Sequence, residues 1–144
     1  GAGLEEVRAA PASIVAVIEA RSAAGLVRDI ALAFASQAMR LPIELAVHDN
    51  PAPTSYRIVR HGQTIAYVRP RRDEVRVEYR LPHDHLAYGW GFGRDSIHGI
   101  GLRIDGQTSF EVGLRLLADA FQLAKAGTYG PPGRADEESD SSEA

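Results

Sequence analysis

The chain has 144 residues, of which 44% are hydrophobic, and its formal net charge is −3 at neutral pH. This length suits one domain with a single core rather than two complete domains. The sequence has no cysteine, which excludes disulfides, thiolate zinc sites and cysteine nucleophiles and favours a reducing, cytoplasmic location. No apolar run reaches the roughly 18 to 20 residues that span a bilayer, so we expect a soluble protein with no membrane partner.

We expect one domain over residues 1–126, within which residues 1–3 are a candidate cloning remnant. Whether the chain is a fragment of a larger protein stays open at this point. Residues 54–103 carry nine arginines against five acids, whereas residues 134–144 carry one arginine against five acids. Residues 127–144 combine Pro, Gly, Ser and acids with no large apolar side chain except Tyr129. We therefore predict a disordered acidic tail. An alternative role for it is autoinhibition, by folding over the arginine-rich middle.

The first third predicts two helices with a break near residues 22–25. Ser13 is a candidate cap for the first helix, whose apolar residues recur at i, i+3 and i+4. The second helix begins near Leu26 and ends before Pro42, which cannot continue it. The pair resembles a DNA-reading helix pair in outline, but the second helix presents mostly apolar residues. We interpret both helices as part of the core.

The middle of the chain predicts three strands joined by tight turns. A two-residue turn at residues 72–73 places Val68 opposite Val77, and it places Arg69 directly opposite Arg76. One face of this hairpin is apolar. The other face collects Ile65, Tyr67, Arg69, Arg76, Glu78 and Arg80.

The register of the preceding strand stays open at this point. A two-residue turn at His61-Gly62 places Tyr56 beside Tyr67, whereas a three-residue turn places it beside Val68. One residue of slip exchanges the two faces of a strand. In the second register the outer face is an arginine field that includes Arg57, with Tyr67 in its middle. Such a face can stack bases and hold phosphates, although solvated arginines are also ordinary on exposed strands.

The glycine-rich passage at residues 87–106 predicts a flexible connector around Trp90 and Arg94, followed by a fourth strand at residues 97–104. It matches no phosphate-loop spacing. Glycine at 99 and 101 indicates that another part of the chain packs closely against that strand. Metal binding is a weaker alternative, and its candidate ligands are His83, His85, Asp95 and His98.

The last element is a long helix with an apolar stripe, over the sequence SFEVGLRLLADAFQLAKAG. Thr108 and Ser109 are alternative caps, and Glu111 follows Thr108 at capping-box spacing. Gly127 is expected to end the helix. The order of elements then gives helices, a sheet and a closing helix.

The sequences TSYRIV, IAYVRPRRDEVRVEYRLP, HGIGLRI and EVGLRLLADAFQLA occur in an order that resembles a small bacterial domain of unknown function. That family is often labelled a predicted transport protein and also occurs beside nuclease-type domains. The resemblance covers about residues 54–125. It implies an α+β fold and an accessory role in binding, and it transfers no catalytic residue.

We therefore predict an α+β fold with N-terminal helices, an antiparallel meander of about four strands and a long C-terminal helix. The predicted function is non-catalytic binding of nucleic acid or an anionic protein segment, with no cofactor. The predicted binding residues are Tyr67, Arg69, Arg76, Arg80, Trp90 and Arg94. The alternatives are a small enzyme that uses histidine and aspartate, with or without a metal, and a structural or oligomerisation domain.

Overall fold

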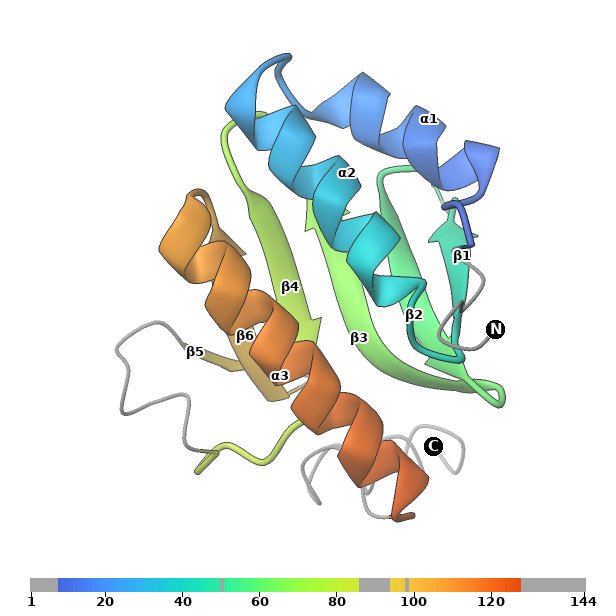
Figure 1. Ribbon diagram of the computed structural model, residues 1–144, viewed down its shortest axis with the longest axis vertical. Coiled ribbons are helices and arrows are strands. Elements are labelled where there is room, and N and C mark those ends of the chain that lie inside the picture. The colour runs from blue at the N-terminus through green and yellow to red at the C-terminus, as the bar shows by residue number, and fades with distance from the viewer. Residues whose placement is uncertain (1–7, 50, 86–93, 98, 128–144) are drawn as a thin grey trace, which may run out of the picture.

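The computed structural model describes residues 8–49, 51–85, 94–97 and 99–127, which form three helices and six strands (Figure 1). In chain order they are α1 (Ala12–Arg21), α2 (Leu26–Ala38), β1 (Glu44–His48), β2 (Ser55–Arg60), β3 (Gln63–Pro70), β4 (Val75–Tyr79), β5 (Arg94–Ser96), β6 (Gly99–Ile104) and α3 (Gln107–Lys125). The α+β class, the two N-terminal helices and the long C-terminal helix are confirmed. The sheet is larger than the four strands expected.

The six strands form one antiparallel sheet in the order β1-β2-β3-β4-β6-β5. β4 therefore pairs with β6, and the short β5 lies outside them at the sheet edge. β1 forms the other edge. These are the two strands that the sequence pattern did not predict, because one has five residues without clear alternation and the other has only three.

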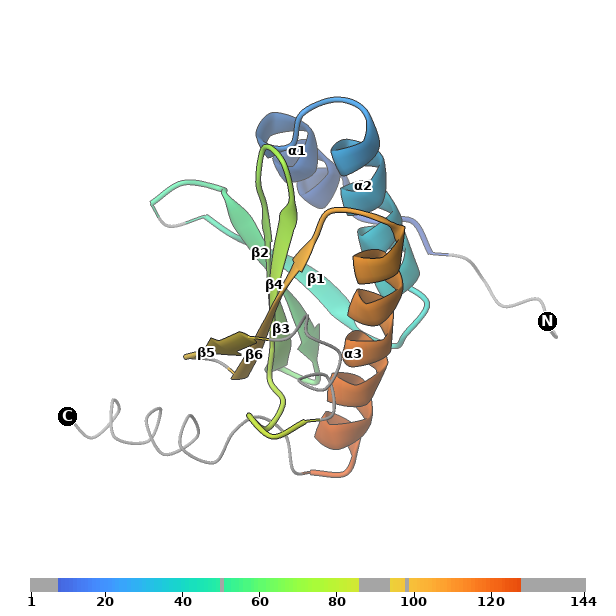
Figure 2. The same cartoon turned by 90° about the vertical axis from the view of Figure 1, so that its left-hand side faces the viewer.

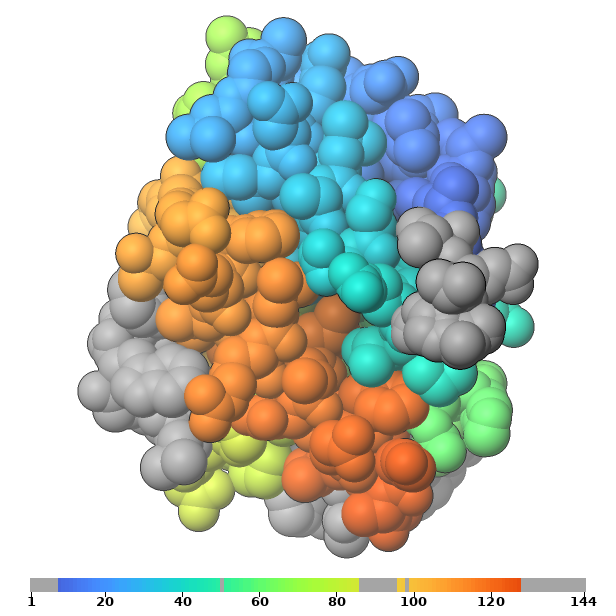
Figure 3. Space-filling view, in the orientation of Figure 1, coloured from blue at the N-terminus to red at the C-terminus, as the bar shows by residue number. Residues whose placement is uncertain are grey.

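All three helices lie on one face of the sheet (Figure 2). Figure 3, drawn in the orientation of Figure 1, shows α2 and α3 side by side over that face. The sheet contributes buried residues such as Val77 and Tyr79, and the helices contribute Phe34 and Leu117. The Tyr79 hydroxyl donates a hydrogen bond of 2.9 Å to the carbonyl of Gly113 on α3. The core thus lies between this face and the helices.

The second hairpin has the predicted register. Ala66 pairs with Tyr79, Val68 with Val77, and Arg69 with Arg76. The period of two along both strands fixed this pairing, because the alternative register would have moved every apolar residue to the other face.

The first hairpin combines the turn of one predicted alternative with the register of the other. Its turn has two residues, His61 and Gly62, both with positive φ (50° and 81°), as the favoured hairpin turns require. Yet Tyr56 pairs with Val68, because a bulge at Ile65 inserts one extra residue into β3. The bulge restores the register in which Arg57 and Tyr67 share the face without helices.

The helix ends differ in part from expectation. The break between α1 and α2 is confirmed, but α1 begins at Ala12 after Pro11, without a side-chain cap, so the assignment of Ser13 as cap was wrong. α3 begins at Gln107, one residue before Thr108. Ser109 still serves the helix start, because its Oγ accepts hydrogen bonds from the backbone N–H groups of Asp105 (3.0 Å) and Gly106 (3.2 Å).

The close approach predicted for the β6 glycines is confirmed at Gly99. A Cβ there would lie 2.1 Å from the carbonyl oxygen of Tyr79, and its φ is +139°, so this position requires glycine. The predicted connector is wrong at residues 94–96, which form β5. Trp90 and the acidic tail beyond Gly127 lie outside the described residues. None of the described helices is both long enough and apolar enough to cross a membrane.

Candidate anion-binding face

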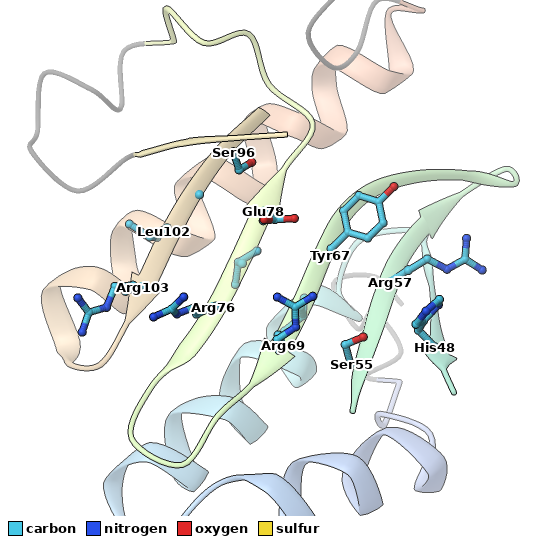
Figure 4. Close-up of a pocket in the computed structure, with 13 residues that line it drawn as sticks. His48, Ser55, Arg57, Tyr67, Arg69, Arg76, Glu78, Ser96, Leu102 and Arg103 are labelled. Atoms are coloured by element: carbon cyan, nitrogen blue, oxygen red, sulfur yellow. The ribbon is translucent and has the colours of Figure 1, made fainter. Parts of the chain in front are cut away.

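The face of the sheet opposite the helices holds a cavity of about 640 Å³, to which all six strands contribute (Figure 4). We call it the trough. Its lining residues are His48, Ser55, Arg57, Tyr67, Val68, Arg69, Arg76, Val77, Glu78, Ser96, Gly101, Leu102 and Arg103. Where the helix-covered face presents aliphatic side chains, the trough presents mainly charged and polar ones.

Three arginines stand in a row across the trough. Arg69 pairs with Arg76, and Arg76 pairs with Arg103, on three neighbouring strands. Neighbouring strands lie about 4.8 Å apart, and like charges at directly opposed positions repel each other. The row continues toward the β1 edge through Ser55 and His48, which pair with each other. Anions placed beside such a row reduce this repulsion.

Glu74, in the turn before β4, supplies one such anion. Its carboxylate accepts hydrogen bonds from Nε of Arg76 (2.5 Å) and Nε of Arg103 (2.8 Å). Burial by itself would raise the pKa of the Glu74 carboxyl, but the hydrogen bonds and positive charges of Arg76 and Arg103 together lower it. The carboxylate is therefore ionised at neutral pH and offsets one of the three cations.

The guanidinium of Arg69 has no hydrogen-bond or ion-pair partner among the described residues. Arg57, one row away, donates from Nη1 to Oγ1 of Thr64 at 3.1 Å, whereas its buried Nε has no partner in the described chain. With Glu74 and Glu78 counted, the four arginines of the trough leave two positive charges in excess. The whole chain has a net charge of −3. The positive charge of the trough therefore results from where the arginines are placed and not from the overall composition.

The next row along the strands contains Tyr67, Glu78 and Gly101, which occupy directly paired positions. Tyr67 is half-buried, and Figure 4 shows its ring with one face turned to the open side of the trough. Glu78 lies beside that ring on β4. An aromatic face next to an arginine row can hold a flat ligand that carries a phosphate.

The structure brings together three of the predicted binding residues, Tyr67, Arg69 and Arg76. Arg80 shares their face but is buried outside the trough, where its Nη1 donates a long hydrogen bond of 3.4 Å to the Tyr67 hydroxyl. Arg94 begins β5 and its backbone pairs with Gly101, while Trp90 lies outside the described residues.

Sequence reasoning missed His48, Ser55, Glu74 and Arg103 as parts of the site. The signal for Arg103 was present, because the alternation of β6 places it on the same side as Gly101. Using that signal required knowing that β4 pairs with β6, although β5 lies between them in the sequence. Nothing in the sequence distinguished Glu74 from any other acidic turn residue.

The candidate metal ligands do not assemble within the described part of the chain. Nε2 of His85 lies 2.7 Å from Oδ2 of Asp119 on α3, and His83 is exposed on the same connection. His98 is outside the described residues. No group of three histidine or acidic side chains suited to a metal occurs among the residues that the structure does describe.

Comparison of the chain with protein-family models, with curated proteins and with solved structures finds no match.

Proposed function

We propose that this domain is a non-catalytic module that binds single-stranded nucleic acid along the trough. The observation that carries the proposal is the row of Arg69, Arg76 and Arg103 on adjacent strands, with one carboxylate between two of its members. Guanidinium groups match phosphate oxygens through paired N–H donors. Successive phosphates would supply the anions that the row lacks.

The shape of the site favours a single strand over a duplex. Duplex DNA is read by helices or ribbons that protrude into a groove, whereas the trough is a recess on a sheet. Open sheets bind single strands by combining cationic side chains with an aromatic platform, and the trough contains both. The absence of cysteine fits action in the cytoplasm, which we propose as the location.

The test is the affinity of a fluorescently labelled, mixed-sequence 12-nucleotide strand, measured by anisotropy between 50 and 200 mM salt. Three phosphate contacts predict a slope of log K against log salt of about −2, since each phosphate on a single strand contributes about −0.7. Arg69→Ala should weaken binding about fivefold to tenfold and reduce the slope by about 0.7. Arg21→Ala, an exposed change of the same charge on α1, serves as the control and should have little effect.

Two results would contradict the proposal. Absence of binding at 50 mM salt would leave the trough without a nucleic-acid role and would favour an oligomerisation domain or an enzyme. Equal binding of poly-glutamate at matched charge, with the same response to Arg69→Ala, would identify an anionic protein segment as the partner.

A further inference from the structure

Resting on the proposed function, we infer that the trough selects guanine at one position, with the base stacked on Tyr67 and its Watson–Crick edge held by the carboxylate of Glu78. The inference concerns the Tyr67–Glu78–Gly101 row. It is separate from the arginine row, which carries the affinity for phosphate. The two rows lie two residues apart along the strands, about 7 Å, so one nucleotide can engage both.

Tyr67 provides the stacking platform. Its side chain is only half-buried at the centre of the sheet, and the ring face is turned outward in Figure 4. The hydroxyl accepts a long hydrogen bond of 3.4 Å from Nη1 of Arg80, which restrains the ring. Bases stack on such rings without regard to sequence, so Tyr67 accounts for binding of a base but not for its identity.

Glu78 provides the means of selection. It is directly opposite Tyr67 on the neighbouring strand, and cross-strand Cβ atoms at such positions are about 5 Å apart. An ionised carboxylate only accepts hydrogen bonds, and it has about four acceptor positions on two oxygens. Glu78 already makes a contact within the protein, and four acceptor positions leave it able to bind a ligand in addition. On its other side is Gly101, which has no side chain to compete for the same space.

The chemistry of the base edges points to guanine. Guanine presents two adjacent donors, N1–H and the exocyclic N2–H, which match the two oxygens of one carboxylate. Cytosine and adenine place an acceptor beside their amino group, and thymine and uracil place a carbonyl on each side of their single N–H. Each of these four bases would bring a lone pair against the carboxylate, which leaves a buried polar group poorly matched.

The experiment compares 12-nucleotide thymine strands that contain one central guanine, adenine or cytosine with the all-thymine strand. A single guanine avoids the self-association of guanine-rich strands. The guanine-containing strand should bind at least about fivefold tighter than the others, the discrimination expected of one well-placed paired contact. Ribonucleotide strands of uracil with the same central bases should give the same order of affinities, because the selection does not involve the sugar.

Glu78→Gln replaces one acceptor by a donor at nearly constant shape. This change should abolish the preference for guanine. The affinity for all strands should rise, because the trough loses a negative charge. Glu44→Gln is the matched control, since Glu44 is exposed on the edge strand β1 and does not line the trough. Tyr67→Ala should weaken all strands, and Tyr67→Phe should weaken none strongly. Equal thermal midpoints would establish that each variant is folded.

The outcomes distinguish failure of the guanine inference from failure of the proposed nucleic-acid binding. Salt-dependent binding without a guanine preference, or a preference that survives in Glu78→Gln, overturns the inference and leaves the proposed function standing. Failure of every strand to bind at low salt overturns both. A guanine preference that disappears in Glu78→Gln and persists in Glu44→Gln supports the inference.

Discussion

The two faces of the sheet are built from alternating residues of the same strands, yet they have opposite chemistry. On β4, Val75, Val77 and Tyr79 are fully buried under the helices, whereas Arg76 and Glu78 face the trough. Five consecutive residues therefore serve the core and the candidate binding site in turn. Substitutions at Val75, Val77 or Tyr79 should therefore lower stability, whereas substitutions at Arg76 or Glu78 should change binding.

The largest effect is expected on the helix-covered face. Tyr79→Ala removes a fully buried aromatic ring and its hydrogen bond to Gly113, and should lower the free energy of unfolding by about 3–5 kcal/mol. Urea denaturation followed by circular dichroism measures this change. The folded fraction should bind oligonucleotide normally. Loss of affinity without loss of stability would mean that this face also contacts the ligand.

A smaller effect, seen as a change in how stability depends on pH, is expected at Glu74. Its pKa is lowered in the folded state, so ionisation favours folding. The stability that the carboxylate contributes is present above the unfolded pKa of about 4.5. It is lost as the pH falls through the lower folded value. In Glu74→Gln the free energy of unfolding should therefore fall less steeply between pH 5 and pH 3 than in the wild type. Parallel pH profiles would show that the two arginines do not stabilise this carboxylate.

The smallest effect on stability is expected in the arginine row itself. Arg69 has no partner in the described chain and stands opposite Arg76, so Arg69→Ala should change the free energy of unfolding by no more than about 0.5 kcal/mol. Any change should be a gain, because one like-charge repulsion disappears. A loss of 1 kcal/mol or more by urea denaturation would assign Arg69 to the scaffold instead.

The two hairpins show how far the sequence determined this arrangement. In the second hairpin, strict alternation on both strands predicted every pair correctly. In the first, the turn and the register were treated as linked, and the bulge at Ile65 uncoupled them. The bulge leaves no periodic signal, because Thr64, Ile65 and Ala66 are all buried and burial does not alternate in this part of β3.

The same limit applied to the site. Arg69 and Arg76 could be paired from a local turn, whereas Arg103 joins them only through a strand pairing that skips β5. Glu74 belongs to the site because it accepts hydrogen bonds from the Nε atoms of Arg76 and Arg103, on two strands. Arg103 is 29 residues away in the sequence. Contacts of this range depend on sheet order, which alternation within a strand does not encode.

Nuclear magnetic resonance can show whether the arginine row is the surface that binds nucleic acid. The Nε–Hε signals of Arg69, Arg76 and Arg103 would be followed while an unlabelled 12-nucleotide strand is added at low salt, together with the methyl signals of Val75, Ile100 and Ile104, which are buried in the core and do not line the trough. If the row binds the strand, the three arginine signals should show large, saturable shifts and the methyl signals should stay nearly unchanged. Unchanged arginine signals during demonstrable binding would contradict the proposed binding surface.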